Sequence, residues 1–121
     1  MRVLICGDRN WSDFDTIFQY LSKLPKDTVV IEGEARGADS MAREAARLLG
    51  LRVEPYPADW EKHGRAAGPI RNKEMLLKGR PDLVVAFHEN IATSKGTKNM
   101  VDQALKAGIK TAVLRGSPGD T

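Results

Sequence analysis

Short apolar runs alternate with longer amphipathic stretches along the chain. The apolar runs predict β-strands at residues 2–6, 28–32, 51–56, 82–87 and 110–114. The first and fourth of these runs do not alternate apolar with polar positions, which is typical of strands covered on both faces. Pro55 cannot donate a ladder hydrogen bond, so the third strand is expected at an edge of the sheet.

The stretches between the strands show the 3.6-residue period of amphipathic helices. We expect helices at about 14–24, 38–49, 69–79 and 97–108. Ser12 or Asp13 can cap the first helix, and Gly50 ends the second. The third starts at Pro69, because proline is favoured at the first helical position.

This order of elements predicts an α/β fold: a Rossmann-like three-layer sandwich with a five-stranded parallel sheet. Right-handed crossovers give the strand order 3-2-1-4-5. The order reverses between strands one and four, so a ligand crevice is expected there, outside the carboxyl ends of the strands. We assign residues 1–115 to a single domain and expect 116–121, which are polar and rich in Gly and Pro, to be a loose tail.

Composition narrows the function classes. The chain has 121 residues, 41% hydrophobic and 29% charged, as in ordinary globular proteins. No apolar stretch approaches the roughly 20 residues of a membrane span, and the run after Met1 is too short for a secretory signal. Cys6 is the single cysteine, so we expect it to fill the core and the protein to be cytoplasmic. A net charge of +3 permits phosphate binding but is no polybasic tail.

The loop at 33–39 follows the second strand and leads into a helix. Gly33 and Gly37 allow the backbone to approach a ligand, and Arg36 adds a forked cationic donor. The free N–H groups of the helix, near Ala38 and Asp39, would face the same anion. The alternative is a tight turn in which Asp39 caps the helix.

Two further loops follow strand ends. Gly96 and Thr97 lie at another helix N-terminus, which is either a second anion site or a simple threonine cap. The long loop at 58–72 carries Trp60, which can stack on a base or cover the core. Four arginines then point to one crevice and are phosphate-clamp candidates: Arg9, Arg36, Arg65 and Arg71. Met75 shares a helix face with the last of them.

Other chemistries find little support in the sequence. The two histidines, His63 and His88, show no metal-ligand spacing with Cys6, and a loop histidine is expected to be solvated. We therefore predict no metal and no cofactor. Carboxylates lie near the crevice, and one could serve as a general base, but spacing pairs none of them: Asp8, Glu34, Asp39, Asp59 and Glu61.

Several strings together resemble a known family. They are GDRNW at 7–11, EGEARGAD at 32–39, PADW at 57–60, GRAAGPIRNKEM at 64–75 and GT at 96–97. In this combination the chain resembles the YspA-like (DUF2493) family of the SLOG superfamily of Rossmann-like domains. That superfamily also includes the LOG or lysine-decarboxylase-like phosphoribohydrolases and a DNA processing protein that binds single strands.

The resemblance implies a nucleotide-like small molecule at the strand ends, such as an ADP-ribose- or NAD-related compound. The expected ligand-binding residues are Gly7, Arg9, Gly33, Arg36, Gly37, Ala38, Asp39, Asp59, Trp60, Arg65, Arg71, Asn72, Met75, Gly96 and Thr97. Since related proteins form dimers, a homodimer is also expected.

One departure separates the chain from the phosphoribohydrolases. Their PGGxGTxxE pattern ends in a glutamate that supports N-glycosidic cleavage, and Met100 stands at that position here. We therefore predict a binding domain, a sensor or a sequestering protein. The alternative is an N-glycosidic hydrolase that uses Asp39 or Asp59 instead. A second alternative is single-stranded nucleic-acid binding with bases stacked on Trp11 and Trp60; with so modest a charge, specific nucleic-acid binding is not expected.

Overall fold

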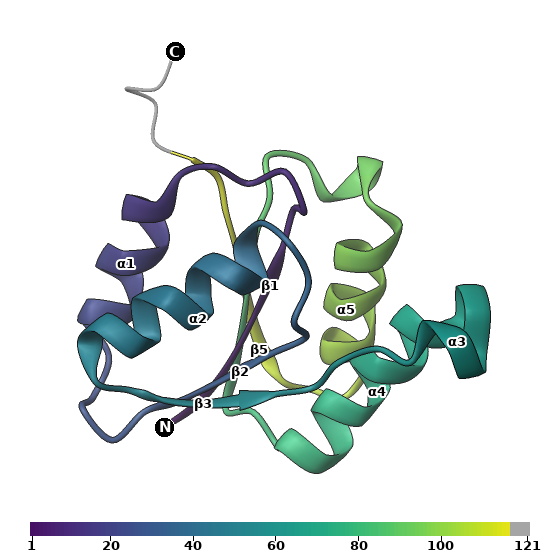
Figure 1. Cartoon of the computed structure of the whole chain (residues 1–121), viewed down its shortest axis with the longest axis horizontal. Coiled ribbons are helices and arrows are strands. Elements are labelled where there is room, and N and C mark those ends of the chain that lie inside the picture. Colours follow the sequence, from purple (N-terminus) through teal and green to yellow (C-terminus); the bar gives the residue numbers. More distant parts are fainter. Residues whose placement is uncertain (117–121) are drawn as a thin grey trace.

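A computed structural model describes residues 1–116 of the chain as three layers around a parallel sheet (Figure 1). The expected tail at 116–121 lies outside the described residues except for Gly116. The backbone N–H of Gly116 donates to a carboxylate oxygen of Glu89 at 2.8 Å. This first tail residue is therefore attached to the loop after the fourth strand.

The sheet has the predicted order. Within residues 1–116 its parallel strands are β1 (Arg2–Gly7), β2 (Val29–Glu32), β3 (Arg52–Pro55), β4 (Leu83–Phe87) and β5 (Lys110–Leu114). They are arranged β3-β2-β1-β4-β5, which confirms the predicted strand order and places Pro55 on an edge strand. Because all strands run the same way, the loops that follow them meet at one edge of the sheet, at the top of Figure 1.

Helices cover both faces of the sheet, as the unalternating strands predict. The described helices are α1 (Phe14–Ser22), α2 (Ala38–Leu49), α3 (Trp60–His63), α4 (Ala67–Gly79) and α5 (Lys95–Lys106), with 3₁₀ turns at Gly64–Ala66 and Ile91–Thr93. In Figure 1, α1 and α2 lie on one side of the sheet and α4 and α5 on the other. The left-handed Gly50 ends α2, as predicted.

Alternate residues of the central strands face two apolar cores. Val3 and Ile5 of β1 pack in the core under α1 and α2. Leu4 and Cys6 point the other way, into the core under α4 and α5. Each fully buried aliphatic side chain of this kind contributes about 1.5–3 kcal/mol. Cys6 is therefore the core residue that the sequence predicted.

Three expectations about the helices need correction. The α4 helix begins at Ala67, two residues before Pro69, and a proline fits there because the N–H groups of a first turn have no intrahelical partner. The cap of α5 is Ser94, whose Oγ accepts the N–H of Thr97, so Thr97 is not the cap. The short α3 lies in a segment that was expected to be a loop.

None of the helices within residues 1–116 has the length and apolar character needed to cross a bilayer.

Candidate functional site

A cavity of about 760 Å³ opens at the carboxyl ends of β1 and β4. The β1–α1 loop, the segment from α3 to α4 and the loop before α5 form its walls. Ten of the predicted ligand-binding residues line it: Gly7, Arg9, Asp39, Trp60, Arg65, Arg71, Asn72, Met75, Gly96 and Thr97. The cavity lies at the strand-order reversal, where the sequence placed the crevice.

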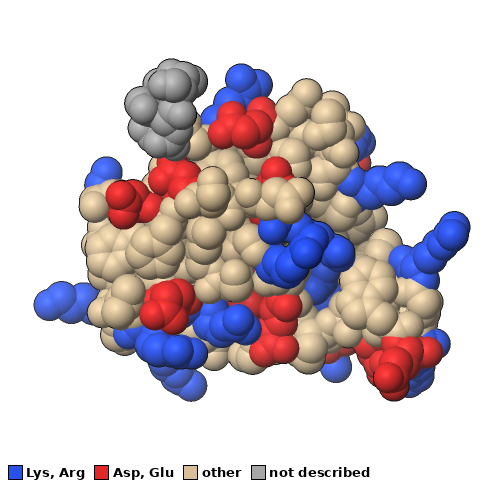
Figure 2. All heavy atoms as spheres, turned by 45° about the horizontal axis from the view of Figure 1, so that its top comes forward, with Lys and Arg blue, Asp and Glu red and all other residues tan. Residues whose placement is uncertain are grey.

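Cationic side chains gather around this cavity. Arg9, Arg65, Arg71 and Lys95 line it, each from a different segment of the chain. Figure 2, in which the carboxyl-end face of the sheet is turned forward, shows blue Lys and Arg atoms grouped near the centre of the face, with red carboxylates beside them. The cavity therefore combines positive charge with a smaller number of carboxylates.

Arg71 is held in place by backbone and side-chain acceptors. Its Nη1 donates to the carbonyl oxygen of Gly33 at 2.5 Å and its Nε to Oδ1 of Asn72 at 3.0 Å. Burial lowers the pKa of the guanidinium, which nevertheless stays charged near neutral pH. A Cβ at position 33 would collide with this guanidinium, so Gly33 is needed for the arginine to lie where it does.

Asn72 joins the two helices that form one wall of the cavity. It is 4% exposed, and its Nδ2 donates to the Gly96 carbonyl oxygen at 3.3 Å and to Oδ1 of Asn99 at 3.1 Å. Its role in the described chain is therefore to fix the first turn of α5 against α4, beside Arg71.

The N-terminus of α5 is open toward the cavity. The Ser94 hydroxyl accepts the N–H of Thr97, whereas within residues 1–116 the N–H groups of Lys95 and Gly96 donate to no acceptor. All four of these residues line the cavity. Unpaired N–H groups and the helix dipole favour an anion at such an end.

The loop before α2 is different, because a carboxylate from the first turn of that helix accepts its N–H groups. Asp39 accepts the N–H of Gly33 at 3.1 Å and the N–H of Ala35 at 3.3 Å. The N–H of Ala38 donates to the Asp8 carbonyl oxygen at 3.0 Å. Burial raises the pKa of Asp39. The alternative in which Asp39 caps the helix is wrong, since Gly37 occupies the cap position without a side-chain bond.

Gly37 has a structural task in this turn. Its φ is +70°, and a Cβ there would collide with the backbone of Asp8 and Arg9. Glycine therefore lets the loops after β1 and β2 touch. Gly37, Ala38 and Asp59 line neither described cavity; Asp59 accepts the N–H of Lys62 and caps α3. The structure thus places these three predicted ligand contacts outside the site.

A smaller cavity of about 350 Å³ adjoins the first. Gly33 and Arg36 line it, and it shares Arg9, Trp60 and Arg71 with the larger cavity. The four predicted arginines are therefore not aimed at one crevice, because Arg36 contributes only to the smaller cavity.

The aromatic and sulfur side chains divide between surface and core. Trp60 is 49% exposed and carries the Arg9 guanidinium 5.7 Å from its ring centroid, so it does not cover the core. Trp11 is 6% exposed and packs on Phe87, which makes it unavailable for base stacking. Met75 and Met100 are buried in the α4–α5 core and form part of the cavity floor.

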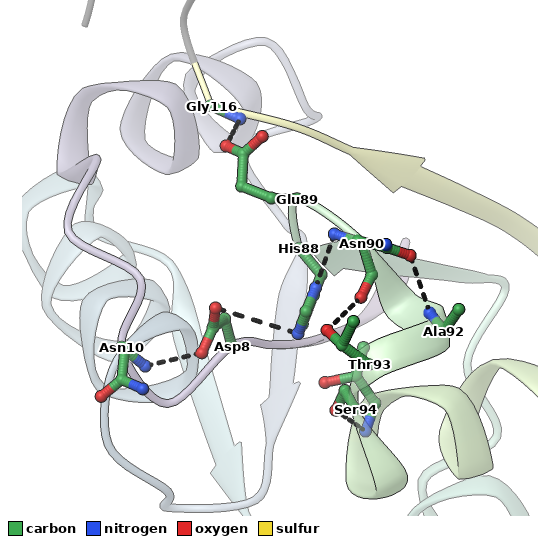
Figure 3. A network of polar contacts seen from close by, with 10 residues as sticks. Asp8, Asn10, His88, Glu89, Asn90, Ala92, Thr93, Ser94 and Gly116 are labelled. Atoms are coloured by element: carbon green, nitrogen blue, oxygen red, sulfur yellow. Dashed lines mark hydrogen bonds and ion pairs between the residues drawn. The ribbon is translucent and has the colours of Figure 1, made fainter. Parts of the chain in front are cut away.

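Sequence reasoning missed a histidine. His88 is 7% exposed and lines the cavity, so the expectation that it is solvated is wrong. Its Nε2 lies 3.8 Å from Oδ2 of Asp8 (Figure 3). The pairing of Gly7 with Phe87 across β1 and β4 brings the two residues together. That register is a long-range feature that no local spacing reveals.

A buried carboxyl lies at the carboxyl end of β2, at the same edge of the sheet. Glu32, the last residue of β2, accepts the Glu34 N–H on Oε1 at 2.6 Å, while its Oε2 has no partner within residues 1–116. Burial raises its pKa to about 7. The described residues contain no group of three or more side chains suited to a metal ion.

Comparison with known proteins identifies the family of this chain. Residues 1–63 match the model of the YspA, cpYpsA-related SLOG family. The Gene 61 protein of Mycobacterium phage D29 is 42% identical over 117 residues, covering 89% of this chain and 91% of the phage protein. The chain belongs to the YspA, cpYpsA-related SLOG family.

A solved structure has a similar fold. DNA processing protein A (DprA) from Streptococcus pneumoniae aligns with 98% of this chain at a TM-score of 0.79 and 16% identity. The chain spans about half of that protein, 52% of its length. This likeness establishes the Rossmann-like α/β fold.

Proposed function

We propose that this SLOG domain binds a nucleotide or a nucleotide derivative, such as an ADP-ribose- or NAD-related molecule, as a sensor or sequestering domain. The observation that carries the proposal is the convergence of Arg9, Arg65, Arg71 and the open α5 N-terminus on one cavity. Its volume of about 760 Å³ lies within the range of about 300–1,000 Å³ typical of small-molecule sites.

Each part of a nucleotide has a matching surface in the cavity. Phosphates suit Arg71 and the free N–H groups of Lys95 and Gly96, since an anion would offset the cost of burying the guanidinium. A base suits the exposed face of Trp60, which is already in contact with a cation. Membership of the SLOG family supports this reading.

The two alternatives have less support. Of the two carboxylates considered for N-glycosidic cleavage, Asp39 is engaged by two backbone N–H groups and Asp59 lies outside the cavity. Single-stranded nucleic-acid binding has less support because Trp11, one of the two tryptophans expected to stack on bases, is buried in the core. We therefore propose binding without cleavage, and the homodimer and the cytoplasmic location stay predictions.

The proposal is tested by a thermal-shift screen with AMP, ADP-ribose and NAD, followed by calorimetry and chromatography of the incubated compound. We expect one of them to raise the melting temperature and to be recovered unchanged. Arg71→Ala should lower its affinity about ten- to hundredfold, the cost of a charge-assisted hydrogen bond. Arg47→Ala, which removes an exposed arginine of α2 outside both cavities, is the matched control.

Equal affinities of the two variants would contradict the assignment of Arg71. Release of a free base would contradict binding without cleavage and would favour the N-glycosidic hydrolase. Absence of binding by every compound, in protein that remains folded, would contradict the proposed function itself.

A further inference from the structure

Asp8 and His88 form a polar pair at the centre of the strand-order reversal. Each follows its strand directly, and the pairing of Gly7 with Phe87 sets them opposite each other. Both line the larger cavity, and Figure 3 shows the two side chains pointing toward one another from β1 and β4. Among the cavity's polar groups, this pair stands apart from the cationic cluster in combining a carboxylate with a ring N–H.

The local backbone fixes which atoms of the pair are available. Oδ1 of Asp8 accepts the Asn10 N–H at 2.8 Å, which leaves Oδ2 toward the histidine. Nδ1 of His88 accepts the Asn90 N–H at 2.9 Å. An imidazole nitrogen that accepts carries no proton, so the neutral ring has its proton on Nε2.

The remaining acceptor and donor are too far apart to satisfy each other. Nε2 of His88 and Oδ2 of Asp8 are separated by 3.8 Å, beyond hydrogen-bond distance. A group placed beside both would have to donate to the carboxylate and accept from the ring N–H. A hydroxyl does both at once, whereas a phosphate oxygen can only accept and would be repelled by the carboxylate.

We propose that Asp8 and His88 together bind a sugar hydroxyl of the ligand and so select ribonucleotides over their deoxy counterparts. This inference rests on the proposed function and names the class of ligand that the cavity selects. The cationic wall, with Arg71 and Lys95, takes the phosphate, and the Asp8–His88 pair takes the neighbouring ribose. Asp8 and His88 are then specificity-determining residues.

The test is calorimetry with AMP, 2′-deoxy-AMP, 3′-deoxy-AMP and inorganic pyrophosphate. In the unaltered protein we expect AMP to bind about tenfold more tightly than at least one deoxy form, the value of a hydrogen bond to a charged group. Asp8→Asn and His88→Asn should abolish this preference. The affinity for pyrophosphate should stay unchanged in His88→Asn and should increase in Asp8→Asn, which removes a negative charge from the cavity. Asp59→Asn, which alters a carboxylate outside both cavities, should keep the preference.

The outcomes separate the two proposals. Binding of all four probes without preference for AMP in the unaltered protein would overturn the ribose assignment and leave the proposed function intact. Failure of every probe to bind would overturn both. Because the comparison of AMP with its deoxy forms needs no variant, the inference is tested even if His88→Asn does not fold.

Discussion

Two helix N-termini at the same edge of the sheet differ in the charge that the chain places beside them: Asp39 lies in the first turn of α2 and Lys95 in that of α5. A glycine lies at each of them, Gly37 before α2 and Gly96 in the first turn of α5, and the sequence predicts an anion site at each. The side chain of Asp39 accepts the N–H groups of Gly33 and Ala35 in the loop before α2. At α5, Ser94 takes one N–H group, and those of Lys95 and Gly96 face the cavity.

The difference indicates which of the two helix N-termini is free to bind a ligand. At α2, Asp39 places a carboxylate beside the helix N-terminus, where it competes with a phosphate, and it holds the preceding loop through two N–H groups, so the α2 turn is a structural element. The α5 turn lacks an acidic residue in its first turn and carries Lys95 instead. We therefore propose that the ligand's phosphate lies at α5 and that the loop before α2 holds Arg71 through the Gly33 carbonyl.

The largest expected effect is on the α2 side. Asp39→Ala leaves two N–H groups without their acceptor in a buried turn, and each unmet group costs about 1–3 kcal/mol. We expect the free energy of unfolding, measured by urea denaturation, to fall by about 2–4 kcal/mol. Asp59→Ala, which removes the exposed cap of α3, should cost about 1 kcal/mol. Equal losses would show that the Asp39 turn is not a structural element.

A second effect on the same side depends on pH. Folded Glu32 keeps its proton up to a pKa of about 7, whereas its ordinary value is 4.5. Between these values the unfolded chain binds fewer protons, so the free energy of unfolding falls as pH rises, and it levels off above about 7.

Glu32→Gln should remove this part of the pH dependence. Relative to the unaltered protein, the variant should gain about 3 kcal/mol between about pH 4 and about pH 8, from about 1.4 kcal/mol for each unit of pKa. Denaturant unfolding at a series of pH values measures the difference. Parallel stability curves for the two proteins would contradict a raised Glu32 pKa.

The smallest expected effect is on pyrophosphate affinity, when the two cations beside the helix ends, Lys95 and Arg36, are removed in turn. Lys95→Ala should weaken pyrophosphate binding about three- to tenfold, because it removes a charge beside the open N–H groups. Arg36→Ala should change it less than about twofold, since Arg36 is exposed at the smaller cavity. Calorimetry at low ionic strength checks both, and the reverse order would move the phosphate to α2.

Local chemistry explains what the sequence predicts well. Gly50 ends α2, Asp13 caps α1 and Pro55 lies on an edge strand, because each depends on backbone geometry close to the residue itself. The strand order follows from crossover handedness, which is equally general. Arg71 and Met75 reach the same cavity because they are four residues apart on one helix.

The missed features depend on contacts between distant segments. The pairing of β1 with β4 turns His88 into a buried partner of Asp8. Packing under α1 removes Trp11 from the surface. Whether Asp39 caps its helix or fills the preceding loop depends on how far the loop folds back, and spacing alone does not contain that information.

The most direct test of the account is a crystal structure of the protein with ADP-ribose. We predict that a phosphate lies within hydrogen-bond distance of Arg71 and of the Lys95 or Gly96 N–H, with a ribose hydroxyl between Asp8 and His88. A phosphate on the N–H groups at 37–39, or a ligand bound outside the cavity at β1 and β4, would contradict the account.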